Sequence, residues 1–139
     1  MAGYMTKMIG NVYEGELVNG AAAPIKNGTL MVMDATGTKL VLPTADNTTK
    51  LIAKEITTLY DGMPAVRFVV NKLNNAYYFV ENGFTGNTAA EYDAREVETA
   101  VGAFLRAHPL TVGDEFVVAT DLQATVGTAY GVLATGLIG

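Results

Sequence analysis

The residue best suited to chemistry is the single histidine, His108, because an imidazole can act as a general base near neutral pH. A catalytic triad also needs a nucleophile and an orienting acid, and His108 directly precedes Pro109 in a segment that predicts a turn. The chain has no cysteine, which excludes disulfides, thiolate nucleophiles and sulfur-based zinc sites. A transition-metal site would need mostly carboxylates, and no Asp-x-Asp or His-x-x-x-His spacing is present. We therefore expect no catalytic residue, no metal and no enzyme.

A run of carboxylates offers a second candidate site. It comprises Glu91, Asp93, Glu96 and Glu98. Such a cluster could bind calcium, or could place two carboxylates for glycoside hydrolysis. However, Arg95 dilutes the charge, and acidic residues are typical of the first turn of a short helix, which the residues 89–95 could form after Thr88 as N-cap. A solvated face is the better interpretation.

An aromatic run, Tyr77-Tyr78-Phe79, could form a platform that stacks on sugars or on a receptor. On a β-strand, however, Tyr77 and Phe79 share one face and Tyr78 takes the other, which is ordinary alternation between core and surface. Gly83 and Gly86 lack the lysine and the following helix of a phosphate loop. We expect no nucleotide or other cofactor.

The composition limits the partners that the chain can have. Half of the residues are hydrophobic and 17% are charged, which indicates a compact core and a surface that is partly covered in an assembly. The net charge of −5 and nine scattered basic residues argue against nucleic acid. No stretch of about 18 apolar residues predicts a membrane span, and the first ten residues lack the apolar region of a signal peptide.

The elements that position these residues are short strands separated by turns. Asn27-Gly28 predicts a tight turn before the apolar run 29–33, which pairs in a hairpin with 39–42. A second pair is expected between 51–60 and 65–70, and the run 76–80 predicts another strand. Strands at this spacing are typical of a small β-barrel or sandwich.

The segment 97–105 fits two patterns. Val97, Val101 and Leu105 belong to both a helical and an extended apolar face, while Gly102 weakens a helix. A short helix followed by a strand is favoured here. After it, Gly113-Asp114 predicts a turn that leads into an apolar strand.

The first twenty residues differ from the rest, since glycines at intervals interrupt any regular element. Residues 1–20 are expected to form an extended N-terminal arm, and residues 21–139 a single compact β domain with at most one short helix. A frayed end is the simpler alternative. The apolar side chains favour an arm that orders on a neighbour, and the expected partner-binding residues are Tyr4, Met5, Met8 and Ile9.

Two stretches of the chain carry a resemblance to a known family. Residues 20–32 contain the pattern Ala-Ala-Ala-Pro-Ile-Lys-Asn-Gly-Thr, and residues 104–116 contain an arginine followed by a Leu-Thr-Val-Gly-Asp turn. Together they resemble the head decoration, or capsid cement, proteins of tailed bacteriophages. The resemblance extends loosely over residues 15–135. It implies a structural virion protein on the outer surface of the phage head, made in the host cytoplasm. Its partner would be the major capsid protein, often at threefold or quasi-threefold positions, which favours a homotrimer.

Such a subunit binds only the assembled lattice, and so stabilises it by its binding free energy. The alternative from another class is a carbohydrate- or receptor-binding β module that uses Tyr77 and Tyr78. An enzyme could only be a carboxylate hydrolase that uses the cluster between Glu91 and Glu98.

Overall fold

The computed structural model describes residues 3–9, 17–44, 47–58, 62–81 and 98–139. Within these ranges every regular element is a β-strand, and none is a helix. The predicted mainly β fold is confirmed. The helix expected at 89–95 lies outside the described residues. No helix of the described ranges has the length and apolarity that a membrane crossing requires.

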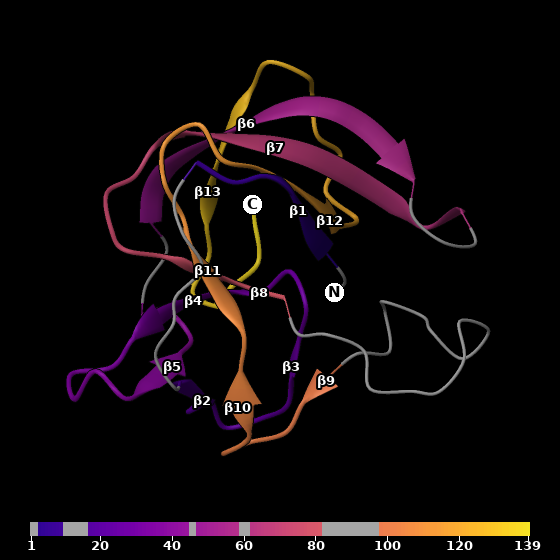
Figure 1. Cartoon of the computed structure of the whole chain (residues 1–139). Coiled ribbons are helices and arrows are strands. Elements are labelled where there is room, and N and C mark those ends of the chain that lie inside the picture. Colours follow the sequence, from indigo (N-terminus) through magenta and orange to yellow (C-terminus); the bar gives the residue numbers. More distant parts are fainter. Residues whose placement is uncertain (1–2, 10–16, 45–46, 59–61, 82–97) are drawn as a thin grey trace.

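A five-stranded sheet in the order β1-β12-β7-β6-β13 forms one side of the molecule. Its strands are β1 (Gly3–Lys7), β12 (Glu115–Ala119), β7 (Pro64–Lys72), β6 (Asn47–Thr58) and β13 (Ala129–Val132). All of its neighbours are antiparallel. The predicted pairing of 51–60 with 65–70 is the β6–β7 hairpin, whose strands are long enough to curl, as the arching ribbons in Figure 1 show.

A six-stranded sheet in the order β10-β2-β5-β4-β8-β11 faces the first sheet. Its strands are β10 (Phe104–Leu105), β2 (Leu17–Asn19), β5 (Lys39–Val41), β4 (Leu30–Met33), β8 (Tyr78–Val80) and β11 (Ala107–Pro109). The expected hairpin is β4–β5, and β2 pairs with β5 in parallel. A small third sheet pairs β3 (Ile25–Lys26) with β9 (Glu98–Thr99).

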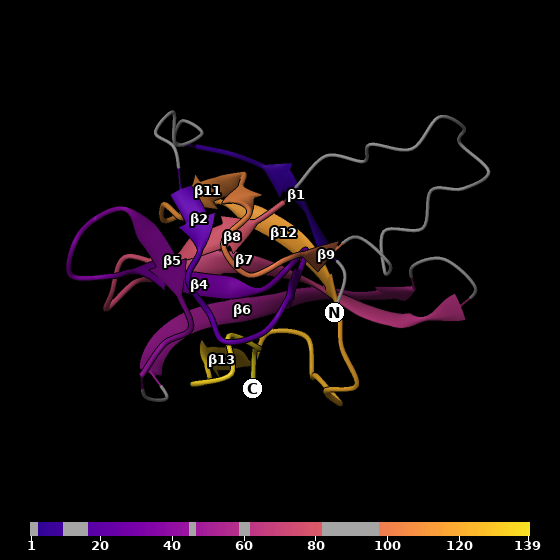
Figure 2. The same ribbon diagram turned by 90° about the horizontal axis from the view of Figure 1, so that it is seen from below.

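Apolar side chains between the sheets form the main core, and a second cluster lies within the six-stranded half. At the centre of the main core, the ring centroids of Phe79 and Phe116 are 4.8 Å apart, so β8 of one sheet packs directly on β12 of the other. Figure 2 shows the same layered arrangement from below, with β6 and β7 crossing the molecule. This curled, two-layered form agrees with the expected barrel or sandwich-like domain.

Two local expectations are corrected. The described part of 97–105 has no helix, because β9 and β10 flank a turn in which Gly102 adopts a φ of 79°, a conformation that suits glycine. His108 and Pro109 lie in β11 and not in a turn. Proline is tolerated there because β11 is an edge strand of its sheet and needs no second ladder partner.

Candidate interaction surface

The N-terminal segment, residues 3–9, lies along β12 as an edge strand. Gly3 stands opposite Val118, and a Cβ on Gly3 would lie 2.8 Å from the Val117 carbonyl oxygen and 2.9 Å from the Gly28 Cα. Only glycine fits this approach. Residues 3–7 are extended and are held against the sheet as one of its strands.

The pleat of β1 divides the predicted partner-binding residues. Met5 is half-buried and packs against the main core, whereas Tyr4 points outward and is exposed. Met8 and Ile9, which follow the strand, are 49% and 55% exposed. Tyr4, Met8 and Ile9 are thus available to a partner, while the Met5 side chain mainly anchors the strand.

A carboxylate closes the outer edge of β1. The Met5 N–H, which points away from β12, donates a hydrogen bond of 2.7 Å to Oε2 of Glu81, the residue that follows β8. An edge strand with open N–H groups is a template for another strand, and an acceptor side chain removes that option. Contacts at β1 are therefore expected through its side chains rather than by strand addition.

A second carboxylate fixes the end of the segment. Asp114 is almost fully buried, its Oδ1 accepts the Ile9 N–H at 2.6 Å, and its Oδ2 accepts the Thr111 N–H at 2.8 Å. The turn that positions Asp114 depends on Gly113, whose φ is 99°. The Gly-Asp turn was predicted from the sequence, but its hold on Ile9 was not, because the two residues are 105 positions apart.

This fixation gathers three exposed aliphatic side chains, which we call the apolar knob: Met8, Ile9 and Val112. The Cγ1 of Ile9 lies 3.3 Å from the position of a Cβ on Gly113, so the two segments touch. Val112 is 55% exposed, like Ile9. Exposed apolar side chains that lie together on a surface are typical of a protein contact site.

The candidate base, His108, is buried between its neighbours. Its Nε2 lies 3.7 Å from Glu81 Oε2, and its Nδ1 has no hydrogen-bond partner within the described residues. Burial lowers the pKa of His108, with the carboxylate of Glu81 acting in the opposite direction and the nearby Arg106 adding to the lowering. Among the described residues, no serine or threonine hydroxyl is hydrogen-bonded to the ring, so the geometry there offers it no nucleophile to activate.

The carboxylate candidates are only partly described. Glu98 lies in β9 with its Oε1 3.7 Å from Lys26 Nζ, which is a surface ion pair. Glu91, Asp93 and Glu96 lie outside the described residues. Among the ranges that the structure describes, no three metal-ligating side chains come together.

The aromatic run follows the predicted alternation. Tyr77 and Phe79 are buried in the main core, and Tyr78 packs half-buried against the second cluster. A ligand that stacks on tyrosine needs an exposed ring face. Tyr77 therefore cannot serve as a sugar platform in this conformation.

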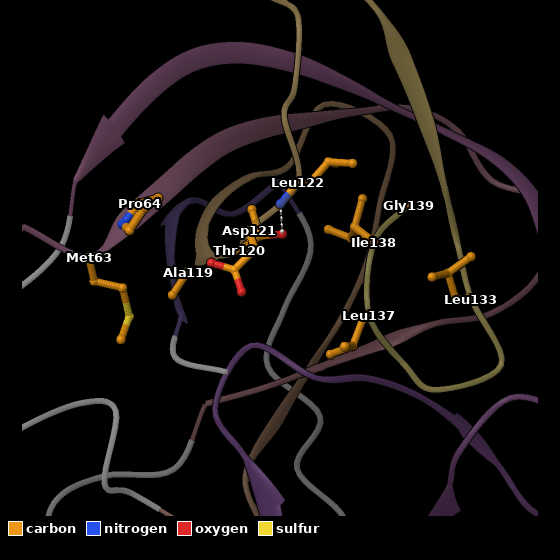
Figure 3. A pocket seen from close by; sticks show the side chains of 10 residues that line it. All are labelled: Met63, Pro64, Ala119, Thr120, Asp121, Leu122, Leu133, Leu137, Ile138 and Gly139. Atoms are coloured by element: carbon orange, nitrogen blue, oxygen red, sulfur yellow. Dashed lines mark hydrogen bonds between the residues drawn. The ribbon is translucent and has the colours of Figure 1, made fainter.

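A pocket of about 540 Å³ lies where β12 ends, and no sequence pattern predicted it. Figure 3 shows its walls, which come from three separate segments of the chain. Its apolar lining consists chiefly of Met63, Pro64, Leu122, Leu133, Leu137 and Ile138. Asp121 is the charged residue among those that line it, and the Leu122 N–H bonds to Thr120 Oγ1 at 3.0 Å to fix the wall.

Comparisons of the chain with protein-family models, with curated proteins and with solved structures found no match.

Proposed function

We propose that this protein is a capsid decoration subunit, which binds the outside of a phage head and stabilises the lattice of the major capsid protein. The resemblance in residues 20–32 and 104–116 suggested this function, and the described residues supply a surface suited to it. In this proposal the protein works by binding alone. A subunit that binds the assembled shell and not its free components shifts the equilibrium toward the shell.

The observation that carries the proposal is the fixed apolar surface along the N-terminal segment. Tyr4, Met8 and Ile9 are exposed, yet the segment is tied down by Glu81 and Asp114. Exposing apolar side chains on an ordered backbone reduces the entropy that a partner must overcome on binding. This is the arrangement expected of a surface that is covered in its working state.

The alternative, a carbohydrate- or receptor-binding module, loses its main support with the burial of Tyr77. A carboxylate hydrolase likewise gains no support from Glu98, which is paired with Lys26. Among the described residues, neither alternative has an observation in its favour.

The test is co-sedimentation of the full chain with purified phage shells, before and after their expansion. We expect saturable binding to expanded shells. Tyr4→Ser, Met8→Ser and Ile9→Ser should each weaken it roughly tenfold, the equivalent of losing much of one buried apolar side chain. Ile56→Ser is the matched control, because Ile56 is 53% exposed on the same sheet but lies on β6, away from β1.

Deletion of the segment is a poor test, because it would remove β1 and expose the core beneath Met5. Point variants that retain the wild-type circular dichroism spectrum avoid this problem. Absence of binding at every stage of expansion would reject the proposal, and equal loss for Ile56→Ser and Ile9→Ser would remove the N-terminal segment from the contact.

A further inference from the structure

The apolar pocket at the end of β12 is not filled by any side chain of the described residues. Leu137 and Leu133 line one wall, Leu122 the second and Met63 the third. Leu137 remains 37% exposed, so the pocket opens to the surface. Its volume of about 540 Å³ has room for more than one aliphatic side chain.

The apolar knob lies at the opposite end of β12 from the pocket. Val112 and Asp114 precede β12, whereas Ala119 ends β12 and already lines the pocket. A strand of five residues spans about 17 Å, which is farther than a side chain reaches. Because Asp114 also holds the Ile9 backbone, the knob cannot fold back into the pocket of its own subunit.

Each feature has one exposed charge beside it, and the two have opposite signs; Lys7 also stands opposite Glu115 of β12 in its own sheet. Lys7 is exposed and directly precedes Met8, while Asp121 is exposed at the pocket. In a contact that seats the knob in the pocket of another copy, these opposite charges come to the same rim. Rim charges of opposite sign favour the correct register of two partners.

We propose that the apolar knob of one subunit seats in the β12 pocket of a second copy, so that subunits join head to tail. Met8 and Ile9 enter the pocket, and Lys7 faces Asp121. Since the two surfaces differ, each subunit keeps one free knob and one free pocket, and successive contacts close into a ring or continue. Tyr4, on the outer face of β1, stays free for the shell. Tyr4→Ser then weakens shell binding directly, whereas Met8→Ser and Ile9→Ser weaken it by breaking the contact between subunits.

The test uses the full chain in solution without shells, so its result is separate from that of the proposed function. Analytical ultracentrifugation of the wild type over a range of concentrations should show association. A knob variant, Met8→Asp with Ile9→Asp, and a pocket variant, Leu137→Asp, should each weaken association about tenfold or more. Phe104→Asp is the control, because Phe104 is an exposed apolar residue (67%) outside both surfaces.

Mixing the two variants separates this contact from other apolar association. The pocket variant retains its knob and the knob variant retains its pocket, so the mixture should form a one-to-one heterodimer that neither variant forms alone. Asp121→Lys should also weaken association, and Lys7→Glu in the same chain should restore it.

Three results would overturn the inference. They are a wild type that stays monomeric at every concentration, a mixture that stays monomeric although both variants keep the wild-type circular dichroism spectrum, and a Phe104→Asp control that loses association as strongly as the knob variant.

Discussion

Asp114→Ala is expected to destabilise the protein and to loosen the N-terminal segment. The carboxylate accepts two backbone N–H groups, from Ile9 at 2.6 Å and from Thr111 at 2.8 Å, and is 1% exposed. Hydrogen bonds to charged acceptors contribute about 1.5–3 kcal/mol each. Water can replace the acceptor for the exposed Ile9, so the lower end of that range applies, and the total loss should be about 3 kcal/mol.

Asp114→Asn separates the two contributions. The amide retains one acceptor oxygen but turns an NH₂ group toward the second donor, so a loss of about 1–2 kcal/mol is expected. Urea unfolding followed by circular dichroism measures the free energy of unfolding of both variants. If the slope of this free energy against urea concentration is the same as in the wild type, the two values can be compared directly. Amide hydrogen exchange at Ile9 should accelerate in Asp114→Ala.

A loss below about 0.5 kcal/mol for Asp114→Ala would refute this reasoning, because it would mean that neither bond contributes to the folded state. Normal exchange at Ile9 in the same variant would show that something other than Asp114 holds the segment.

Three further predictions concern stability. Burial lowers the pKa of His108, so below about pH 6.5 the unfolded chain binds the proton more readily than the folded chain. The free energy of unfolding should therefore decrease as the pH is lowered below that value. Urea titrations at several pH values should show that this part of the decrease is absent in His108→Gln. Phe79→Ala, which removes a fully buried ring in contact with Phe116, should cost about 3–5 kcal/mol in the same assay, and a loss under about 1 kcal/mol would contradict the core described above. Gly136→Ala should lower the melting temperature more than Gly37→Ala. Both glycines have positive φ, but only at Gly136 would a Cβ meet other atoms, the nearest at 2.7 Å. Equal decreases in melting temperature would show that this steric clash does not contribute.

The local elements were largely predictable because their signals are local. The β4–β5 and β6–β7 hairpins connect residues close in sequence, and Gly28 takes a φ of 90° at the predicted Asn-Gly turn. The exception is the segment 98–105, in which the apolar residues fit both the helical and the extended periodicity. Pairing of β10 with β2 decided in favour of strand, and no residue near 104 indicates that partner.

The exposed apolar surface of the N-terminal segment was predictable only in its residue types. Exposed Tyr4, Met8 and Ile9 were expected, but the inward direction of Met5 depends on the register of β1 with β12. The sequence does not encode this register locally. Glu81 and the pocket were missed for the same reason, since each depends on segments that meet only when both sheets have formed.

The pairing of β1 with β12 also sets an order of events during synthesis. The ribosome releases β1 early, whereas Asp114, which holds Ile9, emerges 105 residues later. Until then Met5, Met8 and Ile9 have no place to dock, and such transiently exposed apolar segments invite mispairing or chaperone binding. The finished surface can exist only once nearly the whole described chain has left the ribosome, so an incomplete chain cannot present it.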